Sequence, residues 1–229
     1  MTELDLHQIP GHVAIVADGN GCTVSEATLV DVVDGALEIG LRWLTVDLVA
    51  SARWSEPLGE LRAVLADAER VLVARRDAWH ARGVRVRAIG RRGERLPRRL
   101  RKALDETEAL TAANHGMTLT LGVDHDGRVE LAAAMAAIAE EVRDGARKVA
   151  AIDGDVLAAH LEAPDLPDPD VLVRTAGDTR TANFLVWQAA YSEFVFTDVA
   201  WPDFRRADLF AAVAEFQRRE RRFGAVDPT

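Results

Sequence analysis

The chain has 229 residues, of which 48% are hydrophobic and 28% charged. This size and composition predict one soluble globular domain spanning residues 1–229. A formal net charge of −9 argues against nucleic-acid binding, which depends on basic surfaces. The single cysteine excludes an intrachain disulfide, and neither a signal peptide nor a run as long as a membrane span is evident. We therefore expect a cytoplasmic protein.

Short apolar runs alternate with amphipathic segments along the chain. The apolar runs predict strands at Val13–Ala17, Trp43–Val49, Val84–Ile89, Met117–Val123, Val171–Arg174 and Phe194–Thr197. The amphipathic segments predict helices at Ser25–Ile39, Leu58–Ala81, Leu96–Asn114, Val129–Asp144, Asp153–His160, Thr181–Ala190 and Arg206–Arg221. This alternation is typical of an α/β fold with right-handed crossovers and a mainly parallel sheet.

Several residues mark where the predicted helices begin and end. Ser25 can cap the first helix, and Gly40 and Gly83 each follow a predicted helix. Gly116 follows the third helix, and the Pro-Asp segment Ala163–Asp170 predicts a loop leading into the strand at Val171.

The first predicted strand ends in a turn whose residues could take part in ligand binding or catalysis. The segment from His12 to Gly21 reads HVAIVADGNG, an apolar run followed by residues that tolerate positive φ. In open α/β sheets the ligand crevice lies outside the carboxyl ends of the strands, so we expect Asp18 to face it. The spacing is that of neither a dinucleotide fingerprint nor a P-loop, and Asp-Gly turns are common.

A second segment, from Arg174 to Phe204, carries two arginines six positions apart. Arg174 and Arg180 flank a Thr-Ala-Gly-Asp turn, and two such guanidinium groups can grip a diphosphate. Glu193 would lie near an anion only if a cation such as Mg²⁺ stood between them. From spacing alone, two surface arginines before an ordinary helix–strand connection explain the pattern equally well.

Together these segments resemble the cis-prenyltransferases, the family of undecaprenyl diphosphate synthase. The family opens with H-x-A-I-x-x-D-G-N-G-R-W, which corresponds to His12–Thr23. It closes with R-T-x-G-x-x-R-x-S-N-F-L-x-W-Q-x-x-Y-x-E-x-x-F, then W-P-D-F and R-R-F-G, which correspond to Arg174–Phe196, Trp201–Phe204 and Arg221–Gly224. The resemblance covers nearly the whole chain.

The resemblance implies a six-stranded, mainly parallel sheet wrapped by helices, with an apolar tunnel for an isoprenoid chain, and a homodimer. It implies prenyl diphosphate substrates and Mg²⁺, with at most peripheral contact with a membrane. Asp18 would be the catalytic, magnesium-linked carboxylate, and Glu193 would help to hold the metal. The implied substrate-binding residues are Gly19, Asn20, Gly21, Arg53, Trp54, Arg174, Arg180 and Arg222, the last in a C-terminal segment that reaches towards the partner's active site.

The half of the site that would bind the allylic diphosphate departs from the family. Cys22 and Thr23 stand where the family has Arg-Trp, and the following segment, which carries a further arginine and a Gly-His pair, is absent. In the motif S-x-x-N-W-x-R-P, Arg53 replaces the asparagine and Glu56 replaces the arginine. Arg53 could supply a replacement guanidinium, or it could simply pair with Glu56. In the other half-site, Ala182 replaces a serine.

Two further features carry weaker signals. Asp124-His125-Asp126, at the carboxyl end of a predicted strand, could bind a metal or move a proton, but a polar turn is the favoured interpretation. The basic cluster Arg91–Lys102 could touch anionic lipid headgroups, although such runs are usually solvated.

Two classes of function follow. The first is an isoprenoid diphosphate enzyme with altered substrate handling, which carries out Mg²⁺-dependent prenyl transfer, or ionisation and cyclisation of one prenyl diphosphate. The alternative is an inactive accessory subunit that forms a heteromer with a complete cis-prenyltransferase. The enzyme is favoured by the presence of four residues that a scaffold has no chemical need to keep, namely Asp18, Arg174, Arg180 and Glu193.

Overall fold

The computed structural model describes residues 4–17, 24–90, 93, 95–180 and 182–219. A six-stranded sheet runs through it in the order β3-β4-β2-β1-β5-β6, and every pairing between neighbours is parallel. The strands are β1 (His12–Val16), β2 (Trp43–Val49), β3 (Arg85–Ile89), β4 (Thr118–Val123), β5 (Val171–Arg174) and β6 (Glu193–Phe196). The sheet confirms the predicted fold class. The first and last residue of each strand differ from the predicted ones by no more than one position.

Four helices cover one face of the sheet: α1 (Glu26–Glu38), α2 (Leu58–Ala81), α3 (Arg98–Thr111) and α6 (Arg206–Arg218). Side chains of successive strand residues point to opposite faces. Val13 and Ile15 of β1 accordingly join the large apolar cluster beneath these helices, whereas Ala14 and Val16 join a smaller cluster on the other face. Both faces of the sheet are therefore buried, which explains the continuous apolar strand sequences.

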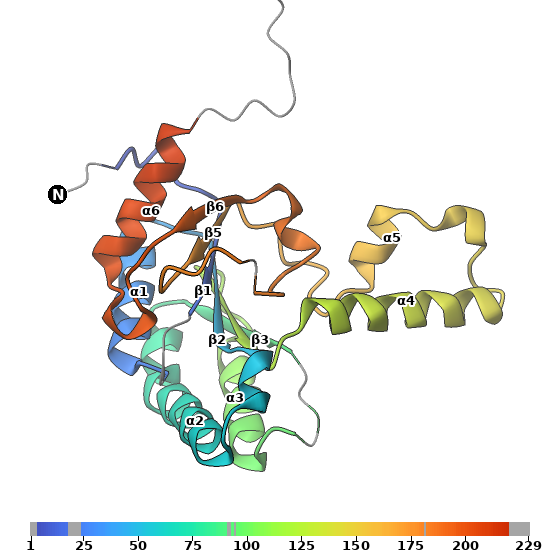
Figure 1. Cartoon of the computed structure of the whole chain (residues 1–229), viewed down its shortest axis with the longest axis horizontal. Coiled ribbons are helices and arrows are strands. Elements are labelled where there is room, and N and C mark those ends of the chain that lie inside the picture. The colour runs from blue at the N-terminus through green and yellow to red at the C-terminus, as the bar shows by residue number, and fades with distance from the viewer. Residues whose placement is uncertain (1–3, 18–23, 91–92, 94, 181, 220–229) are drawn as a thin grey trace, which may run out of the picture.

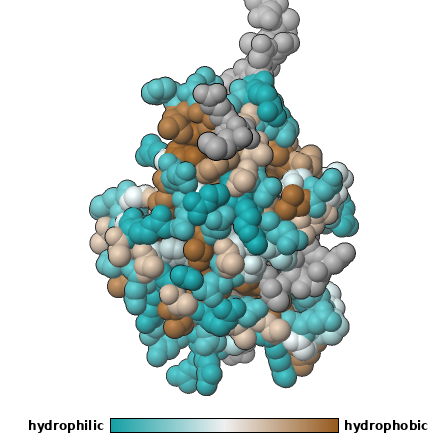
Figure 2. Space-filling model, turned by 90° about the vertical axis from the view of Figure 1, so that its left-hand side faces the viewer, coloured by the Kyte–Doolittle hydropathy of each residue, from teal (hydrophilic) through white to brown (hydrophobic). Residues whose placement is uncertain are grey.

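The remaining two helices form an arm. Helices α4 (Gly127–Arg143) and α5 (Gly154–Ala159) project together from the body of the protein (Figure 1). The short 3-10 helices are η1 (Ser51–Ser55), η2 (Val149–Ala151), η3 (Gln188–Tyr191) and η4 (Trp201–Asp203). Figure 2 shows the face on the α1 and α6 side, which is largely hydrophilic with separate hydrophobic patches.

The predicted helix boundaries have local causes. The Ser25 hydroxyl accepts a hydrogen bond from the backbone N–H of Thr28 and caps α1. Gly40 and Gly83, which follow α1 and α2, have φ values of +74° and +73°. Glycine adopts this left-handed conformation with little strain because it has no Cβ, and the helices end there. No helix of the described residues is long and apolar enough to cross a membrane.

The predicted helix Thr181–Ala190 is wrong. Residues 182–187 form turns, and only η3 follows them. Ala182, Asn183 and Leu185 have positive φ, which no right-handed helix allows. Tertiary contacts override the helical periodicity here: Phe184 and Leu185 are buried in the smaller apolar cluster, and the Asn183 carbonyl accepts the N–H of Gly127 at 2.9 Å.

Candidate functional site

The carboxyl ends of β1 and β5 lie side by side, because Val16 pairs with Arg174 in parallel register. The predicted site residues Asp18, Gly19, Asn20 and Gly21 follow β1 directly in the sequence but lie outside the described residues, as does Arg222. The described part of the predicted diphosphate site therefore consists of Arg174, the last residue of β5, and the segment that follows it.

Asp178 joins the two predicted diphosphate-binding arginines. Arg174 is 2% exposed, and its Nη2 donates to Asp178 Oδ2 at 2.9 Å. Arg180, whose side chain is 85% exposed, donates to the same carboxylate from Nη2 at 2.6 Å and from Nε at 3.0 Å. Hydrogen bonds from Arg180, with help from Arg174, hold the pKa of Asp178 well below its ordinary value. Two guanidinium groups share one carboxylate, so this group of three has a net positive charge suited to an anion.

The turn that carries these arginines is tied to the sheet. The buried Thr175 hydroxyl donates to the Val16 carbonyl at 2.9 Å. The N–H groups of Ala176 and Gly177, both at positive φ, donate to the carbonyls of Val199 and Thr197 at 2.9 Å. The arginines are thus presented from a braced turn at the edge of the sheet where ligands of open α/β folds bind.

Glu193 lies at the opposite edge. It pairs with Val171 at the amino end of β6, and Arg174 pairs with Phe196 three residues further along, about 10 Å by strand geometry. Its Oε2 lies 3.6 Å from Nη1 of Arg219, which also donates to the Phe194 carbonyl. Within one chain the structure does not bring Glu193 to the predicted diphosphate site, so this carboxylate does not suit a magnesium ion bound beside Arg174.

Arg53 and Trp54 lie on η1, just after β2. Arg53 is 9% exposed, and its Nη1 donates to both carboxylate oxygens of Glu56 at 3.2 and 3.3 Å. Its charge is therefore balanced within the motif itself, in line with the simple ion-pair interpretation. The ring of Trp54 is covered by the Arg95 guanidinium, whose carbon is 5.0 Å from the ring centroid.

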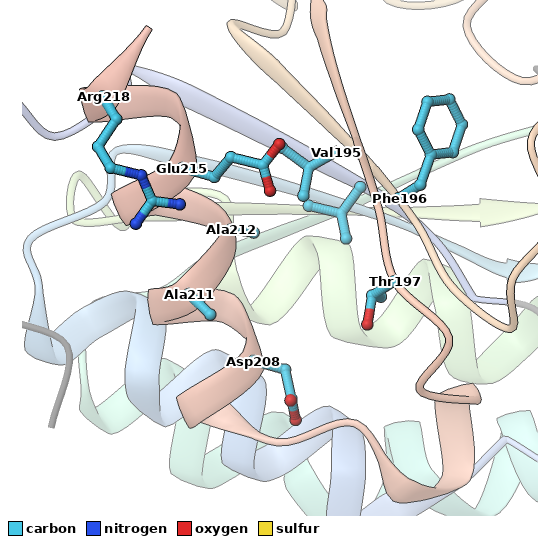
Figure 3. A pocket seen from close by; sticks show the side chains of 9 residues that line it. Val195, Phe196, Thr197, Asp208, Ala211, Ala212, Glu215 and Arg218 are labelled. Atoms are coloured by element: carbon cyan, nitrogen blue, oxygen red, sulfur yellow. The ribbon is translucent and has the colours of Figure 1, made fainter.

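A hollow of about 230 Å³ lies nearby, between α6 and the strands β5 and β6. Figure 3 shows Asp208 and Glu215 on the α6 side of it and Val195, Phe196 and Thr197 on the strand side. Its carboxylates outnumber the one arginine that lines it, Arg218, so its charge does not suit a diphosphate.

The Asp124-His125-Asp126 segment is a turn, as favoured from the sequence, but its first two residues are buried. Asp124 has a φ of +57° and is 0% exposed, and His125 is 2% exposed. Asp126 caps α4 by accepting the N–H groups of Arg128 and Val129. The buried positions of Asp124 and His125 were not expected from a polar triplet.

Sequence reasoning missed two residues of this region. Asp178 lies inside the predicted turn, four residues after Arg174 and two before Arg180. This spacing was the sequence signal that could have identified it as a partner of both arginines. Arg95 belongs to the basic cluster Arg91–Lys102; its contact with Trp54 is a tertiary one, with no sequence signal. The Oδ2 atom of Asp124 lies 3.8 Å from Arg95.

Comparisons with known proteins identify the family of the chain. A family model described as putative undecaprenyl diphosphate synthase matches residues 17–224. The chain is 41% identical to isoprenyl transferase 2 of Bradyrhizobium diazoefficiens, over 97% of this chain and 93% of the relative. It is 40% identical to the trans,polycis-polyprenyl diphosphate synthase, (2Z,6E)-farnesyl diphosphate specific, of Thermobifida fusca, over 99% and 84%.

A solved structure gives the same result. The crystal structure of lavandulyl diphosphate synthase from Lavandula x intermedia, in complex with dimethylallyl diphosphate, superposes with a TM-score of 0.90 at 30% identity, covering 96% of this chain and 100% of that one. The family match, the level of identity and the shared architecture extend over nearly the whole chain. The protein therefore belongs to the cis-prenyltransferases, a family of enzymes that transfer prenyl groups.

Proposed function

We propose that the protein catalyses Mg²⁺-dependent transfer of a prenyl group from one diphosphate ester to another, with an altered site for the allylic diphosphate. The observation that carries this proposal is the Arg174–Asp178–Arg180 group at the carboxyl edge of the sheet. A diphosphate displaces part of the Asp178 contacts and takes up guanidinium donors that are already held in place.

Each arginine has a distinct role in this proposal. Arg174 is buried and braced by the turn, so it fixes the position of the diphosphate. The Arg180 side chain is 85% exposed and pairs with the neighbouring Asp178, so it can close over the anion once the anion has bound. Held in this way, the substrate would be oriented for attack with little further loss of freedom.

We propose Asp18 as the carboxylate that holds Mg²⁺ with the diphosphate oxygens. The ion would supply positive charge to the leaving diphosphate. Glu193 lies at the other edge of the sheet within the same chain, so its predicted part in metal binding would require a second copy of the protein. An apolar tunnel for the prenyl chain also remains part of this proposal.

We further propose a homodimer that forms through the arm. The arm and the adjoining segment expose large apolar side chains, with Met135, Val149, Ile152 and Trp187 between 37% and 70% exposed. Of these, Met135, Ile152 and Trp187 line a hollow of about 390 Å³ between α4 and α5. An apolar surface of this kind is typical of a subunit interface. Sedimentation velocity should give a dimer for the wild type and for Val73→Glu, a matched exposed position on α2, and a monomer for Met135→Glu; dimers in all three would refute the interface.

The test of activity is diphosphate release in the presence of Mg²⁺. Dimethylallyl, geranyl, farnesyl and geranylgeranyl diphosphates are each supplied with and without isopentenyl diphosphate. The variants are Asp18→Asn and Arg180→Gln. Arg70→Gln is the matched control, because Arg70 on α2 is also exposed and held by carboxylates, those of Asp67 and Glu26.

Transfer predicts release only when both substrates are present, reduced in both site variants and unchanged in Arg70→Gln. Release without isopentenyl diphosphate would instead identify ionisation or cyclisation of one prenyl diphosphate. The Arg53–Glu56 pair favours a second candidate, an inactive accessory subunit, because it leaves the allylic side without the guanidinium that the family has there. That candidate predicts no release from the chain alone and increased release when it is mixed with a complete family member.

A further inference from the structure

Three side chains that can bind a metal meet near the base of the arm, apart from the proposed diphosphate site. His125 follows β4, Glu130 lies in the first turn of α4, and Glu162 follows α5. The Nε2 atom of His125 is 3.8 Å from Glu130 Oε2, and its Nδ1 atom is 3.8 Å from Glu162 Oε2. One ligand atom from each residue lies within 4.8 Å of the other two.

Two buried polar atoms at this cluster have no hydrogen-bond partner among the described residues. They are Nδ1 of His125 and Oε1 of Gln188, whose residues are 2% and 3% exposed. The Gln188 side chain points into the cluster, because its Nε2 lies 3.4 and 3.5 Å from the two carboxylate oxygens of Glu130. Buried polar atoms are nearly always bonded, so two exceptions at one place indicate a missing partner.

The charge of the cluster indicates that this partner is a cation. Two carboxylates face one imidazole in largely buried surroundings, and Glu130 is 3% exposed. The carboxylates of Glu130 and Glu162 each lie 3.8 Å from a ring nitrogen of His125. The negative field of two carboxylates at one place attracts a metal ion.

The ligand types and spacing suit a first-row divalent ion. Imidazole nitrogen and carboxylate oxygen both bind Zn²⁺ at about 2.0–2.2 Å in a tetrahedral arrangement, which places ligand atoms about 3.4 Å apart. The cluster, whose ligand atoms lie within 4.8 Å of one another, therefore needs to contract by up to about 1.4 Å. Glu162 can provide this movement and a path for the ion, because 34% of its side chain is exposed.

We propose that His125, Glu130 and Glu162, with Gln188 Oε1 as a further ligand, bind one first-row divalent cation of the Zn²⁺ class. The site is distinct from the magnesium site proposed at Asp18, because β4 and β1 are separated by β2. Gln188 begins η3, at the end of the segment that carries Arg174 and Arg180. The ion would fix that end of the segment to the junction of β4 and α4.

The probe is Zn²⁺ added to full-length protein that has been stripped with a chelator, with affinity measured by competition against a chromophoric chelator. The test variant is Glu162→Gln. The matched control is Glu108→Gln, because both carboxylates accept a backbone N–H from the β3 region, Glu162 from Gly90 at 2.6 Å and Glu108 from Ala88 at 2.7 Å. We expect one Zn²⁺ per chain, at least tenfold weaker binding in Glu162→Gln, and no change in Glu108→Gln.

Co²⁺ substitution provides a second, spectroscopic readout. The expected absorption has ligand-field bands without thiolate charge transfer, which also excludes Cys22 as a ligand. His125→Gln should abolish these bands. If the wild type binds no stoichiometric Zn²⁺, or if Glu162→Gln and Glu108→Gln bind it equally, the cluster is a charge-paired histidine and the proposal is wrong.

Discussion

His12 should make the stability of the protein fall between neutral and mildly acidic pH. Its Nδ1 donates to the Pro167 carbonyl at 2.7 Å, so its Nε2 accepts from the Thr45 hydroxyl at 2.8 Å. This neutral tautomer satisfies both ring nitrogens in a residue that is 1% exposed. Burial lowers the pKa of His12 from 6.5 to about 4, against the opposing effects of the Pro167 carbonyl and the Asp170 charge.

The sign and the size follow from linkage. A histidine with a lowered folded-state pKa stabilises the fold fully above about pH 6.5, and this contribution is lost as the pH falls towards about 4, because only the unfolded chain takes up the proton. With a pKa of 6.5 unfolded and about 4 folded, the loss between about pH 7.5 and 4.5 is on the order of 2.5 kcal/mol.

The assay is urea unfolding followed by tryptophan fluorescence at both pH values, at one protein concentration. His12→Gln cannot titrate, so the wild type should lose about 2–3 kcal/mol more than this variant over the same interval. His80→Gln serves as the control, because His80 is exposed at the end of α2, and it should behave as the wild type does. If His12→Gln shows the same pH dependence as the wild type, the linkage argument is refuted.

Three further predictions follow from contacts described above. Arg174→Lys should weaken inorganic diphosphate binding, measured by calorimetry, by about tenfold or more, because an ammonium cannot replace the guanidinium fork; equal affinity would contradict its role. Phe184→Ala should lower the free energy of unfolding by about 3–5 kcal/mol, since Phe184 is 2% exposed in the smaller apolar cluster, and a loss below 1 kcal/mol would show that this cluster is loosely packed. The pKa of His160 lies above its ordinary value because the Val156 carbonyl and the Glu141 carboxylate bind its ring, so Glu141→Gln should lower that pKa in an NMR titration; an unchanged pKa would exclude the pair.

Local patterns predicted most of the fold. The strands were legible because both faces of the sheet are buried, which makes β1 and β5 continuous apolar runs. The helix beginning after Ser25 was legible because the cap is encoded within four residues. The segment Thr181–Ala190 was not, because its backbone is set by contacts with residues such as Asp126, more than fifty positions away; Asn183 Nδ2 donates to Asp126 Oδ1 at 2.7 Å.

The same distinction applies to the site. Arg174 and Arg180 were predicted from motif and spacing, and the structure brings them together through Asp178. The placement of Glu193 was also available from the sequence, because Glu193 directly precedes the predicted strand Phe194–Thr197 and so lies at the amino end of that strand. Its role beside the metal came from the family resemblance alone. The burial of His125, in contrast, depends on Phe184, whose ring meets it edge-on at 5.4 Å.

The position of β1 in the sheet has a consequence for how the protein is made. β1 is an inner strand, and its neighbours β2 and β5 pair Val13 with Leu44 and with Val171. During synthesis, β2 can join β1 early, but the other edge of β1 has no partner until about three quarters of the chain has left the ribosome. An apolar strand with an open edge is prone to pairing with other chains. The nascent chain should therefore depend on chaperone protection over this interval, until β5 emerges and covers the edge.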